Sequence, residues 1–485
     1  MQYPHFNTLT TWYRQARDLW LQRQGQQTPI NNIPRLLTMP HPPFVRDCSL
    51  TQEIGSWLRL LEWQMLPAAP PRQHFGYLPV PPATYIAAYL VKLDQNIRTM
   101  TQLRRFLAAH PALVWALGFP LISDGRQPFG FDVHSRLPTP RHFSRVLADL
   151  PNEALQNLLD GQVQRLRTWL PEEFGQTVSL DTKHIIAWVK ENNPKAYIKE
   201  GRFHKTKQPV GDPDCKVGCK RRHNRQVVTP KREGQPATRL SVSMGEYYWG
   251  YASGIVVTRL AEWGEFVLAE LTQTFDHGDT TYFFPLMAQV EKRLGFRPRF
   301  GALDAGFDAF YVYDYFHSDH HDGFAAVPFS EKGGKPTRQF AEDGRPLCAA
   351  ALPMHLKFVY TDRTTAIIPY QRAKYVCPLL ESQSDAAGCP VDHKLWPKNG
   401  CTTTLANTPG ARIRHQLDRE STTYKQVYDQ RTATERIFSQ AVALDIERPK
   451  LRNQAAISNQ NTLTYLLLNL REMRRLQEKL ESAAE

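Results

Sequence analysis

The sequence predicts an α/β fold with a mixed sheet, preceded by a helical N-terminal domain and carrying an insertion before its last core helix. Three observations support this prediction. Residues 1–175 place apolar side chains mainly at helical spacing, residues 176–330 alternate strand-like and helical runs, and residues 331–410 are rich in Gly, Pro, Thr and Cys. Strands, a helix, a strand and a helix in succession are typical of an α/β core.

The first 175 residues predict a compact helical domain. Ile54, Trp57, Leu58 and Leu61 fall on one helical face, and a proline-rich connector follows at 67–82. Further helices are expected at 85–93, at 96–109 and in two segments within 139–170, with Pro140 near a helix start. Such a domain in a basic chain is often a DNA-binding head, and a plain helical scaffold fits the pattern equally well.

The composition favours a polyanionic partner inside the cell. The 485 residues have a formal net charge of +13, which suggests nucleic acid before an anionic membrane surface. No apolar run is long enough to span a bilayer, and the N-terminus lacks the basic-then-apolar pattern of a secretory signal. We therefore expect a cytoplasmic, nucleoid-associated protein without membrane contact, and seven cysteines that are free thiols or metal ligands.

Residues 190–232 are expected to form a basic loop. They hold thirteen Lys and Arg against four Asp and Glu, a net charge of +9, with few apolar residues. Phosphate contacts need this kind of surface, and a solvated loop is the alternative. The residues expected to contact DNA here are Lys220, Arg221, Arg222 and Arg225.

The segment 176–330 predicts the first part of the core. Its strand-like runs lie at 177–181, 238–243, 247–259, 265–274, 299–304 and 323–328, and its helical runs at 284–293 and 308–317. Two of the strand-like runs end in an acid, Asp181 and Asp304. Side chains from separate elements converge on a site at sheet ends, so these two acids are candidates for one site.

The segment 411–470 predicts the rest of the core. Residues 411–448 contain no Gly or Pro and indicate one helix that stops at Pro449. Arg431 and Glu435 interrupt an apolar stripe on this helix, which also carries Tyr428. An Arg–Glu ion pair four residues apart is one explanation, and a carboxylate aimed at a metal with Arg431 placed for phosphate is the other. The last segment, 471–485, is charged and expected to fray.

Three carboxylates from separate elements are what a two-metal phosphodiester site needs. Asp181, Asp304 and Glu435 are our candidates, since Mg²⁺ prefers oxygen ligands and two such ions can activate an attacking oxygen and stabilise the leaving one. The nearby alternatives are acids that could serve other purposes, with Asp308 a candidate helix cap: Asp308, Asp314, Glu420 and Asp429. His184 is expected to be a packed or surface side chain.

The combination resembles the bacterial insertion-sequence transposases of the Asp-Asp-Glu type, which have a ribonuclease H-like core. The matching pieces are Leu180-Asp181-Thr182-Lys183, Ala302-Leu303-Asp304-Ala305-Gly306-Phe307 and the Tyr-x2-Arg-x3-Glu signature from Tyr428 to Glu435. Tyr247-Tyr248-Trp249-Gly250-Tyr251 is similar to the second core strand of the family. The family often has a Lys seven residues after the Glu, where this chain has Val442; Lys450 or Arg452 could substitute in space.

The resemblance implies a function. Asp181, Asp304 and Glu435 would bind two Mg²⁺ ions, for which Mn²⁺ could substitute, and water would cut the DNA at the ends of the element. The freed 3′-hydroxyl would then attack target DNA. Arg431 would contact a DNA phosphate or steady Glu435, and Tyr428 would pack beside the DNA. The partners would be double-stranded DNA and a second copy of the chain bound to it.

Two other classes stay open. One is a catalytically inactive DNA-binding protein with the same core, and the other is a nuclease without strand transfer. The intact set of Asp181, Asp304 and Glu435 favours an enzyme over the first class. The sequence alone does not separate a nuclease from a transposase.

The cysteines of the insertion could bind a metal. Four thiolates could make a tetrahedral structural Zn²⁺ site from Cys348, Cys377, Cys389 and Cys401, the last three of which recur at twelve-residue steps. The set lacks a close Cys-x2-Cys pair, and free core thiols are the alternative. A weaker set of Cys215, Cys219 and His223 lies in the basic segment, and Cys48 is a lone thiol.

Overall fold

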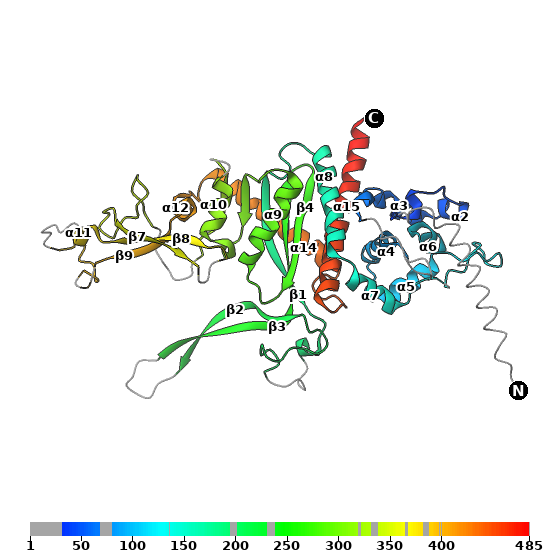
Figure 1. Ribbon diagram of the computed structural model, residues 1–485, viewed down its shortest axis with the longest axis horizontal. Helices are drawn as coiled ribbons and strands as arrows, with labels where there is room; N and C mark the ends of the chain where they lie inside the picture. The colour runs from blue at the N-terminus through cyan, green and yellow to red at the C-terminus, as the bar shows by residue number, and fades with distance from the viewer. Residues whose placement is uncertain are drawn as a thin grey trace.

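The computed structural model shows helices at one side, a central six-stranded sheet, and a small separate sheet at the other side (Figure 1). It describes residues 32–67, 80–134, 136–194, 201–229, 238–318, 322–330, 338–363, 367–381, 388–396, 398 and 400–484. The expected α/β class with a mixed sheet is confirmed. Within the described residues, no helix is both long and apolar enough to cross a membrane.

The part before the sheet is helical, as the sequence indicates. It contains η1 (Arg35–Leu37), α2 (Pro43–Arg46), α3 (Ser49–Leu58), η2 (Trp63–Met65), α4 (Pro82–Asp94), α5 (Met100–Ala109), α6 (Pro111–Leu117), α7 (Pro140–Asp149) and α8 (Asn152–Trp169). Local signals set several of these starts. Thr99 and Gln102 form a capping box at α5, and Thr139 caps α7 immediately before Pro140. The boundary at residue 175 stays a prediction.

The central sheet combines parallel and antiparallel pairs. Its strands are β1 (Thr177–Ile186), β2 (Lys216–Thr229), β3 (Thr238–Leu260), β4 (Gly264–Thr274), β5 (Phe300–Leu303) and β6 (Phe324–Ala326). Their order is β2-β3-β1-β5-β6, with β4 also paired to β3. β1, β5 and β6 are parallel neighbours, whereas β3 is antiparallel to β1, β2 and β4. The carboxyl ends of β1 and β5 therefore lie at the same edge.

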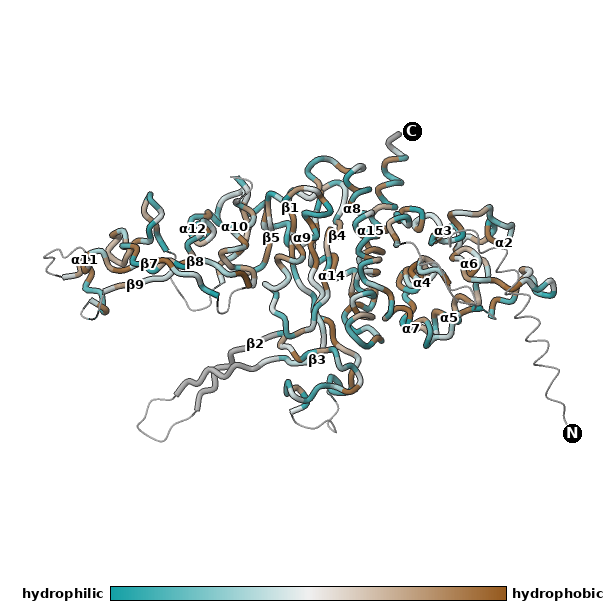
Figure 2. Tube along the Cα trace, in the orientation of Figure 1, coloured by the Kyte–Doolittle hydropathy of each residue, from teal (hydrophilic) through white to brown (hydrophobic). Residues whose placement is uncertain are grey.

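One hydrophobic core joins the helical part to the sheet. A continuous cluster of buried apolar residues extends from Ile54 in α3 to Leu476 in α15 (Gln454–Ala484). Helix α15 packs against α4, α7 and α8 on one side and β4 on the other, and α9 (Phe283–Leu294) packs on β3 and β4. Figure 2 shows apolar stretches gathered in the central sheet and its neighbouring helices.

The expected basic loop at 190–232 is wrong in part, because much of it is strand. After the short η3 (Lys190–Asn192), β2 pairs with β3 from Lys216 to Thr229 and the two form an arm that leaves the sheet (Figure 1). The expected runs at 238–243 and 247–259 are parts of one strand, β3. Residues 220–226 are all polar, and the backbone groups of this run are paired across the ladder with β3.

The expectation of one helix over 411–448 is also wrong. This segment forms α12 (Pro409–Gln416), α13 (Thr422–Tyr428), η6 (Asp429–Arg431) and α14 (Thr432–Ala443). Leu417 leaves the helical conformation with ψ of 120°, and the Ser421 hydroxyl accepts the Tyr424 N–H at 3.2 Å to start α13. A serine that caps a new helix competes with continuation of the old one. The helix ends before Pro449, at a left-handed Asp445 with φ of 68°.

The tail does not fray where expected, since α15 continues to Ala484. Ion pairs hold its exposed face: Arg475 with Glu472 at 2.7 Å, and Arg474 with Glu478 at 3.1 Å. Pairs three or four residues apart stabilise an exposed helix by a few tenths of a kcal/mol each, about 0.2–0.5. The Arg475 guanidinium also donates to the Trp263 carbonyl at 2.5 Å, which ties the tail to the sheet.

The insertion forms a second, smaller sheet. Its strands are β7 (His355–Asp362), β8 (Tyr370–Val376) and β9 (Thr402–Ala406), in the order β7-β8-β9, with α11 (Pro378–Glu381) after β8. It follows α10 (Phe310–Ser318), which packs against α12. The sheet has a small core of its own, made of Met354, Ala373 and Tyr375.

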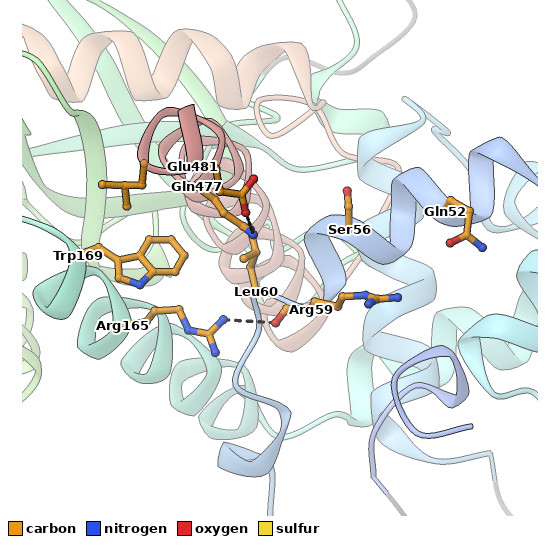
Figure 3. Close-up of a pocket in the computed structure, with 9 residues that line it drawn as sticks. Gln52, Ser56, Arg59, Leu60, Arg165, Trp169, Gln477 and Glu481 are labelled. Atoms are coloured by element: carbon orange, nitrogen blue, oxygen red, sulfur yellow. Dashed lines mark hydrogen bonds between the residues drawn. The ribbon is translucent and has the colours of Figure 1, made fainter. Parts of the chain in front are cut away.

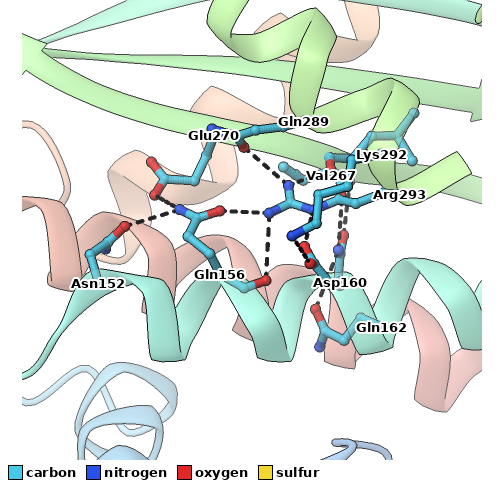
Figure 4. A network of polar contacts seen from close by, with 11 residues as sticks. Asn152, Gln156, Asp160, Gln162, Val267, Glu270, Gln289, Lys292 and Arg293 are labelled. Atoms are coloured by element: carbon cyan, nitrogen blue, oxygen red, sulfur yellow. Dashed lines mark hydrogen bonds and ion pairs between the residues drawn. The ribbon is translucent and has the colours of Figure 1, made fainter. Parts of the chain in front are cut away.

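A buried polar network lies between α8, β4, α9 and α15 (Figure 4). Arg293 in α9 is 3% exposed and pairs with Asp160 in α8, with an Nε–Oδ1 distance of 2.5 Å. Its Nη1 donates to the Leu268 carbonyl at 2.7 Å and its Nη2 to Gln156 Oε1 at 2.6 Å. Glu270 accepts from Gln156 Nε2 at 2.8 Å and from the Thr462 hydroxyl. Burial raises the pKa of Glu270 to about 7, against the hydrogen bonds and the Arg293 charge that lower it.

Candidate active site

Asp181 and Asp304 lie at neighbouring positions on two parallel strands. The last register pair of β1 and β5 joins Leu180 to Leu303, so the two aspartates follow directly on adjacent strands. Asp304 comes after the end of β5, as expected. Asp181 does not end its strand, because β1 continues to Ile186 in antiparallel pairing with β3. The sheet therefore positions Asp181 where β5 stops, rather than at a strand end.

Both carboxyl groups are held in surroundings that oppose their ionisation. Burial, together with the negative charges of Asp304 and Asp279, raises the pKa of Asp181 to about 7. The Thr182 N–H, at 2.7 Å from Oδ1, and the Arg431 charge act against this rise. Burial likewise raises the pKa of Asp304, while the Gly306 N–H at 2.8 Å and Arg431 lower it. Because Asp279 and Arg431 affect the pKa of both Asp181 and Asp304, these four residues form one cluster of charges.

Asp279 is a member of this cluster that sequence reasoning missed. It begins η4 (Asp279–Tyr282), which follows β4 and packs against η5 (Ala305–Phe307). Its Oδ1 accepts the Thr182 hydroxyl at 2.7 Å, and its charge raises the pKa of Asp181 and of Asp304. Its only sequence signal is an acid in the loop after a core strand, which many unrelated loops share.

Arg431 connects Glu435 to the two aspartates. Arg431 Nη2 lies 2.8 Å from Glu435 Oε1, with the side chains 24% and 52% exposed. Burial lowers the pKa of Arg431, but Glu435, Tyr428 and Asp181 together hold it above its usual value. The segment η6 that carries Arg431 packs against β1 and β5. The Arg–Glu ion pair, one of the two explanations that the sequence left open, is therefore present, and the same guanidinium also acts on both aspartates.

The other candidate acids have structural partners. Asp308 is not a helix cap: its Oδ1 accepts Arg414 Nε at 2.7 Å and its Oδ2 accepts the Ser330 N–H at 2.8 Å. Burial raises its pKa, but these contacts outweigh burial and the pKa is lowered. Asp314 accepts the Gly410 N–H at 2.5 Å, and Glu420 pairs with Lys425 at 2.9 Å on the surface. Asp429 starts η6 and is exposed.

The residues proposed for metal binding do not form a closed set. Among the described residues, no group of three or more His, Cys, Asp or Glu side chains is arranged to hold a metal ion. Asp181 and Asp304 are brought together by the sheet, with Asp279 beside them. Glu435 is paired with Arg431 instead.

The expected DNA-contacting residues lie on the β2–β3 arm. Lys220 stands at the register shift between Cys219 and Arg221, and it is half-buried. Arg221, Arg222 and Arg225 belong to β2, but their side chains lie outside the described part of the structure, as does that of His223. Cys215 is buried and its thiol donates to the Asp212 carbonyl at 3.2 Å, which gives it a partner other than a metal.

Three further residues named from the sequence have clear positions. His184 packs against Phe275, with ring centroids 4.6 Å apart, and burial lowers its pKa, so it is a packed side chain. Lys450 and Arg452 both lie over the exposed Trp188 ring, at 5.4 and 4.9 Å from its centroid. Val442, where a lysine would stand in the resembled family, is 39% exposed.

A groove of about 810 Å³ lies elsewhere, between α3, α8 and α15 (Figure 3). Its lining includes Arg59, Arg165 and Trp169, and among the described residues that line it the one acid is Glu481. Arg165 Nη1 donates to the Arg59 carbonyl at 3.3 Å, so that guanidinium is already engaged. This groove lacks the paired carboxylates of the candidate active site and does not contain that site.

Asp181→Asn is expected to stabilise the metal-free protein at alkaline pH. The folded pKa of about 7 exceeds the unfolded value of about 3.9, so this group's contribution to stability is complete below pH 4 and is lost as the pH rises through 7. Asn keeps an acceptor for the Thr182 N–H and has no charge to desolvate. The difference in the free energy of unfolding should shift in favour of the variant between pH 4 and pH 8.

Chemical denaturation in EDTA at four or five pH values measures this difference. Asp322→Asn, which removes an exposed carboxylate paired with Arg299, is the control. A difference between Asp181→Asn and wild type that does not change with pH would contradict the burial of an ionisable Asp181.

Comparison of the chain with models of protein families and with curated protein sequences gives no match.

Proposed function

We propose that this protein is a DNA transposase of the Asp-Asp-Glu type with a ribonuclease H-like core. The observation that carries the proposal is the placement of Asp181 and Asp304 on adjacent parallel strands, with the cationic Arg431 acting on both. A mixed sheet with β1 between an antiparallel and a parallel neighbour is compatible with such a core. The excess of basic residues in 190–232, part of which forms the β2–β3 arm, supports DNA as the partner.

The donor set fits a hard divalent cation by its chemistry. Asp181 and Asp304 are carboxylates whose ionisation is opposed by burial and by Asp279, and a cation beside them would reverse that penalty. We propose that these two residues and Glu435 hold Mg²⁺, or Mn²⁺ in its place. When bound, the ions supply Lewis acidity and neutralise developing charge on phosphate.

The chain's own groups have distinct parts in the proposed reaction. Water attacks a phosphodiester phosphorus at the end of the element, the P–O3′ bond breaks, and the 3′-oxygen leaves with a proton as a hydroxyl. That hydroxyl then attacks a phosphorus of target DNA and displaces a second 3′-oxygen. Arg431 holds Glu435 before DNA binds and faces a phosphate afterwards, because a guanidinium fits either oxyanion group. Tyr428, whose ring lies 5.8 Å from the Arg431 guanidinium, packs beside the DNA.

Strand joining is the measurement that tests this function. The full-length protein is incubated with Mg²⁺ and a plasmid that carries its own coding region with the native flanking DNA. We expect cuts at two sites that flank the coding region, followed by joining of the 3′ ends to a second plasmid. Cuts without joining would indicate a nuclease, and binding without cuts would indicate an inactive DNA-binding protein. Joining two ends together further requires at least two copies of the chain on DNA.

Glu435→Gln separates the two explanations of the Arg431–Glu435 pair. Loss of an exposed ion pair costs about 0–1 kcal/mol, so a purely structural pair predicts near-normal stability and near-normal cleavage. A metal ligand predicts near-normal stability and a loss of cleavage of more than about 100-fold, since even outer-shell changes at metal sites cost about 10–100-fold. We expect the second result in the plasmid assay. Glu478→Gln, which breaks the comparable pair with Arg474 on α15, is the matched control.

A further inference from the structure

Three cysteine thiols of the insertion converge at one end of its small sheet. Cys377 follows β8 and Cys401 precedes β9, and the register pair Val376–Thr402 makes them the next opposed positions across the two strands. Their thiols are hydrogen-bonded to each other. Cys348 comes from the segment before β7, and it packs on the same Met354–Ala373–Tyr375 core as Cys401. Residues far apart in the chain thus bring three sulfur atoms into one region.

The backbone around these thiols approaches closely. Gly400 is left-handed, with φ of +68°, and a Cβ at this position would lie 2.6 Å from Cys377 Cβ. Both the left-handed backbone and this short distance exclude a side chain at position 400. The glycine therefore allows the backbone next to Cys401 to lie directly against Cys377. The segment that carries Cys389 returns here too, because Gly400 N–H donates to the Leu395 carbonyl at 2.9 Å and Leu395 lines a cavity with Cys377.

The charges beside the thiols favour a dianionic cluster. Lys357, Lys374 and Lys398 line the same cavity of about 770 Å³ as Cys377. Four thiolates around one Zn²⁺ carry a net charge of −2, which three ammonium groups would offset. Zinc binds cysteine as the deprotonated thiolate, which is why positive charge beside the site matters.

Among its described residues, the small sheet has a small core. Its buried apolar cluster contains three described residues, with Cys348, Cys401 and Leu405 packed against them, and is separate from the main core. Several large apolar side chains of β7 are exposed instead: Leu356, Phe358, Val359 and Tyr360. Small units with so little buried apolar surface usually depend on a disulfide or a structural metal. A link between the segments that carry Cys348, Cys377 and Cys401 would tie the strands together at one end.

We propose that Cys348, Cys377, Cys389 and Cys401 bind one structural Zn²⁺ that closes this end of the insertion. Four thiolates suit zinc, which prefers tetrahedral sulfur ligands in structural sites. In the described part of the chain, no three potential metal ligands are already arranged as a metal site. Zinc binding therefore requires Cys348 and Cys389 to move toward the Cys377–Cys401 pair. Each thiol that binds releases its proton to solvent.

Zinc content of the full-length protein tests this inference. The untagged protein, purified without chelator, is analysed by elemental mass spectrometry, and we expect about one zinc per chain. Cys377→Ser, Cys401→Ser, Cys348→Ser and Cys389→Ser should each lose the metal, because structural zinc sites use four ligands. Cys48→Ser is the matched control and should retain it, since Cys48 lies among the N-terminal helices.

A second measurement covers variants that fail to fold. Wild-type protein is stripped of metal and titrated with Co²⁺, and tetrahedral thiolate coordination should appear as intense visible and near-ultraviolet absorption that Zn²⁺ then abolishes. Absence of zinc from the wild type together with no cobalt spectrum would overturn the inference. Zinc retained in Cys377→Ser and Cys401→Ser, or a Cys377–Cys401 disulfide found by mass mapping of alkylated protein, would also overturn it. Asp304→Asn should keep its zinc, so failure of the proposed function does not affect this test.

Discussion

Asp304→Ala is expected to abolish DNA cleavage while DNA binding stays within about twofold of wild type. The loss should exceed about 100-fold, because removal of a proposed ligand must cost more than the 10–100-fold seen for outer-shell changes at metal sites. The physical reason is that Asp304 lies next to Asp181 on the parallel strand β5, where its carboxylate would hold a cation against phosphate. Binding should persist because the basic β2–β3 arm and Lys220 are unchanged.

Asp304→Asn removes the charge of Asp304 but keeps a hydrogen bond that Asp304→Ala would lose. Asp304 Oδ1 accepts the Gly306 N–H at 2.8 Å and starts η5, and alanine loses that contact whereas asparagine keeps it. Since burial raises the pKa of Asp304, loss of its charge should not destabilise the folded chain. Cleavage in Mg²⁺ and binding by gel shift are measured for both variants. Asp322→Asn is the control, and cleavage at the wild-type rate in Asp304→Asn would remove Asp304 from the site.

Arg293→Met is expected to lower the free energy of unfolding by about 3–5 kcal/mol, the cost of breaking a buried ion pair by removing one partner. Methionine would fill the space but leave buried Asp160 with the exposed Lys292 ammonium at 2.9 Å in place of its 2.5 Å contact to Arg293, and the Leu268 carbonyl without its donor. Arg293 also lowers the pKa of Glu270, so its loss favours the neutral acid there. The loss in the free energy of unfolding should therefore be larger at pH 8 than at pH 5. At the higher pH the Glu270 carboxyl is ionised in the unfolded chain, and the folded variant opposes this ionisation more strongly than wild type does.

Urea denaturation followed by circular dichroism measures this effect. Arg299→Met is the matched control, since Arg299 makes an exposed ion pair with Asp322 and such pairs are worth about 0–1 kcal/mol. Equal losses in the two variants would mean that the Asp160–Arg293 pair contributes no more than a surface pair. A double variant, Asp160→Asn with Arg293→Met, should recover part of the loss, because it removes the buried carboxylate that has lost its guanidinium partner.

Local patterns in the sequence were sufficient for much of the fold. Helical spacing and proline positions predicted the helices near 85–93 and 284–293, which are observed as α4 and α9. A short apolar run that ends in an acid predicted β5 and the position of Asp304 after it. The charge excess of residues 190–232 is evident from the sequence, but the sequence did not predict that part of this segment forms a strand. Residues 220–226 are all polar, so no alternation of apolar and polar side chains indicates a strand there.

The sequence predictions that were wrong or incomplete at the candidate site share one cause. The structure of these segments depends on contacts with residues far away in the chain. Ser421 restarts a helix at a point where the sequence alone has no Gly or Pro. Asp279 joins the site only because η4 packs against η5, from a segment about a hundred residues after Asp181 in the chain. Asp308 looked like a helix cap, but Arg414, far along the chain, pairs with it instead. Contacts of this kind leave no local pattern.

By itself the sequence determined the residue types of this protein, their helical and strand periods, its basic charge and the spacing of Asp181, Asp304, Arg431 and Glu435. Only the tertiary structure decided which of these groups share an environment. Parallel pairing of β1 with β5 brings the two aspartates together, and η6 turns Arg431 toward both while it holds Glu435. The reason is physical: backbone periodicity is local, whereas burial, pKa and ion pairing depend on which segments pack together.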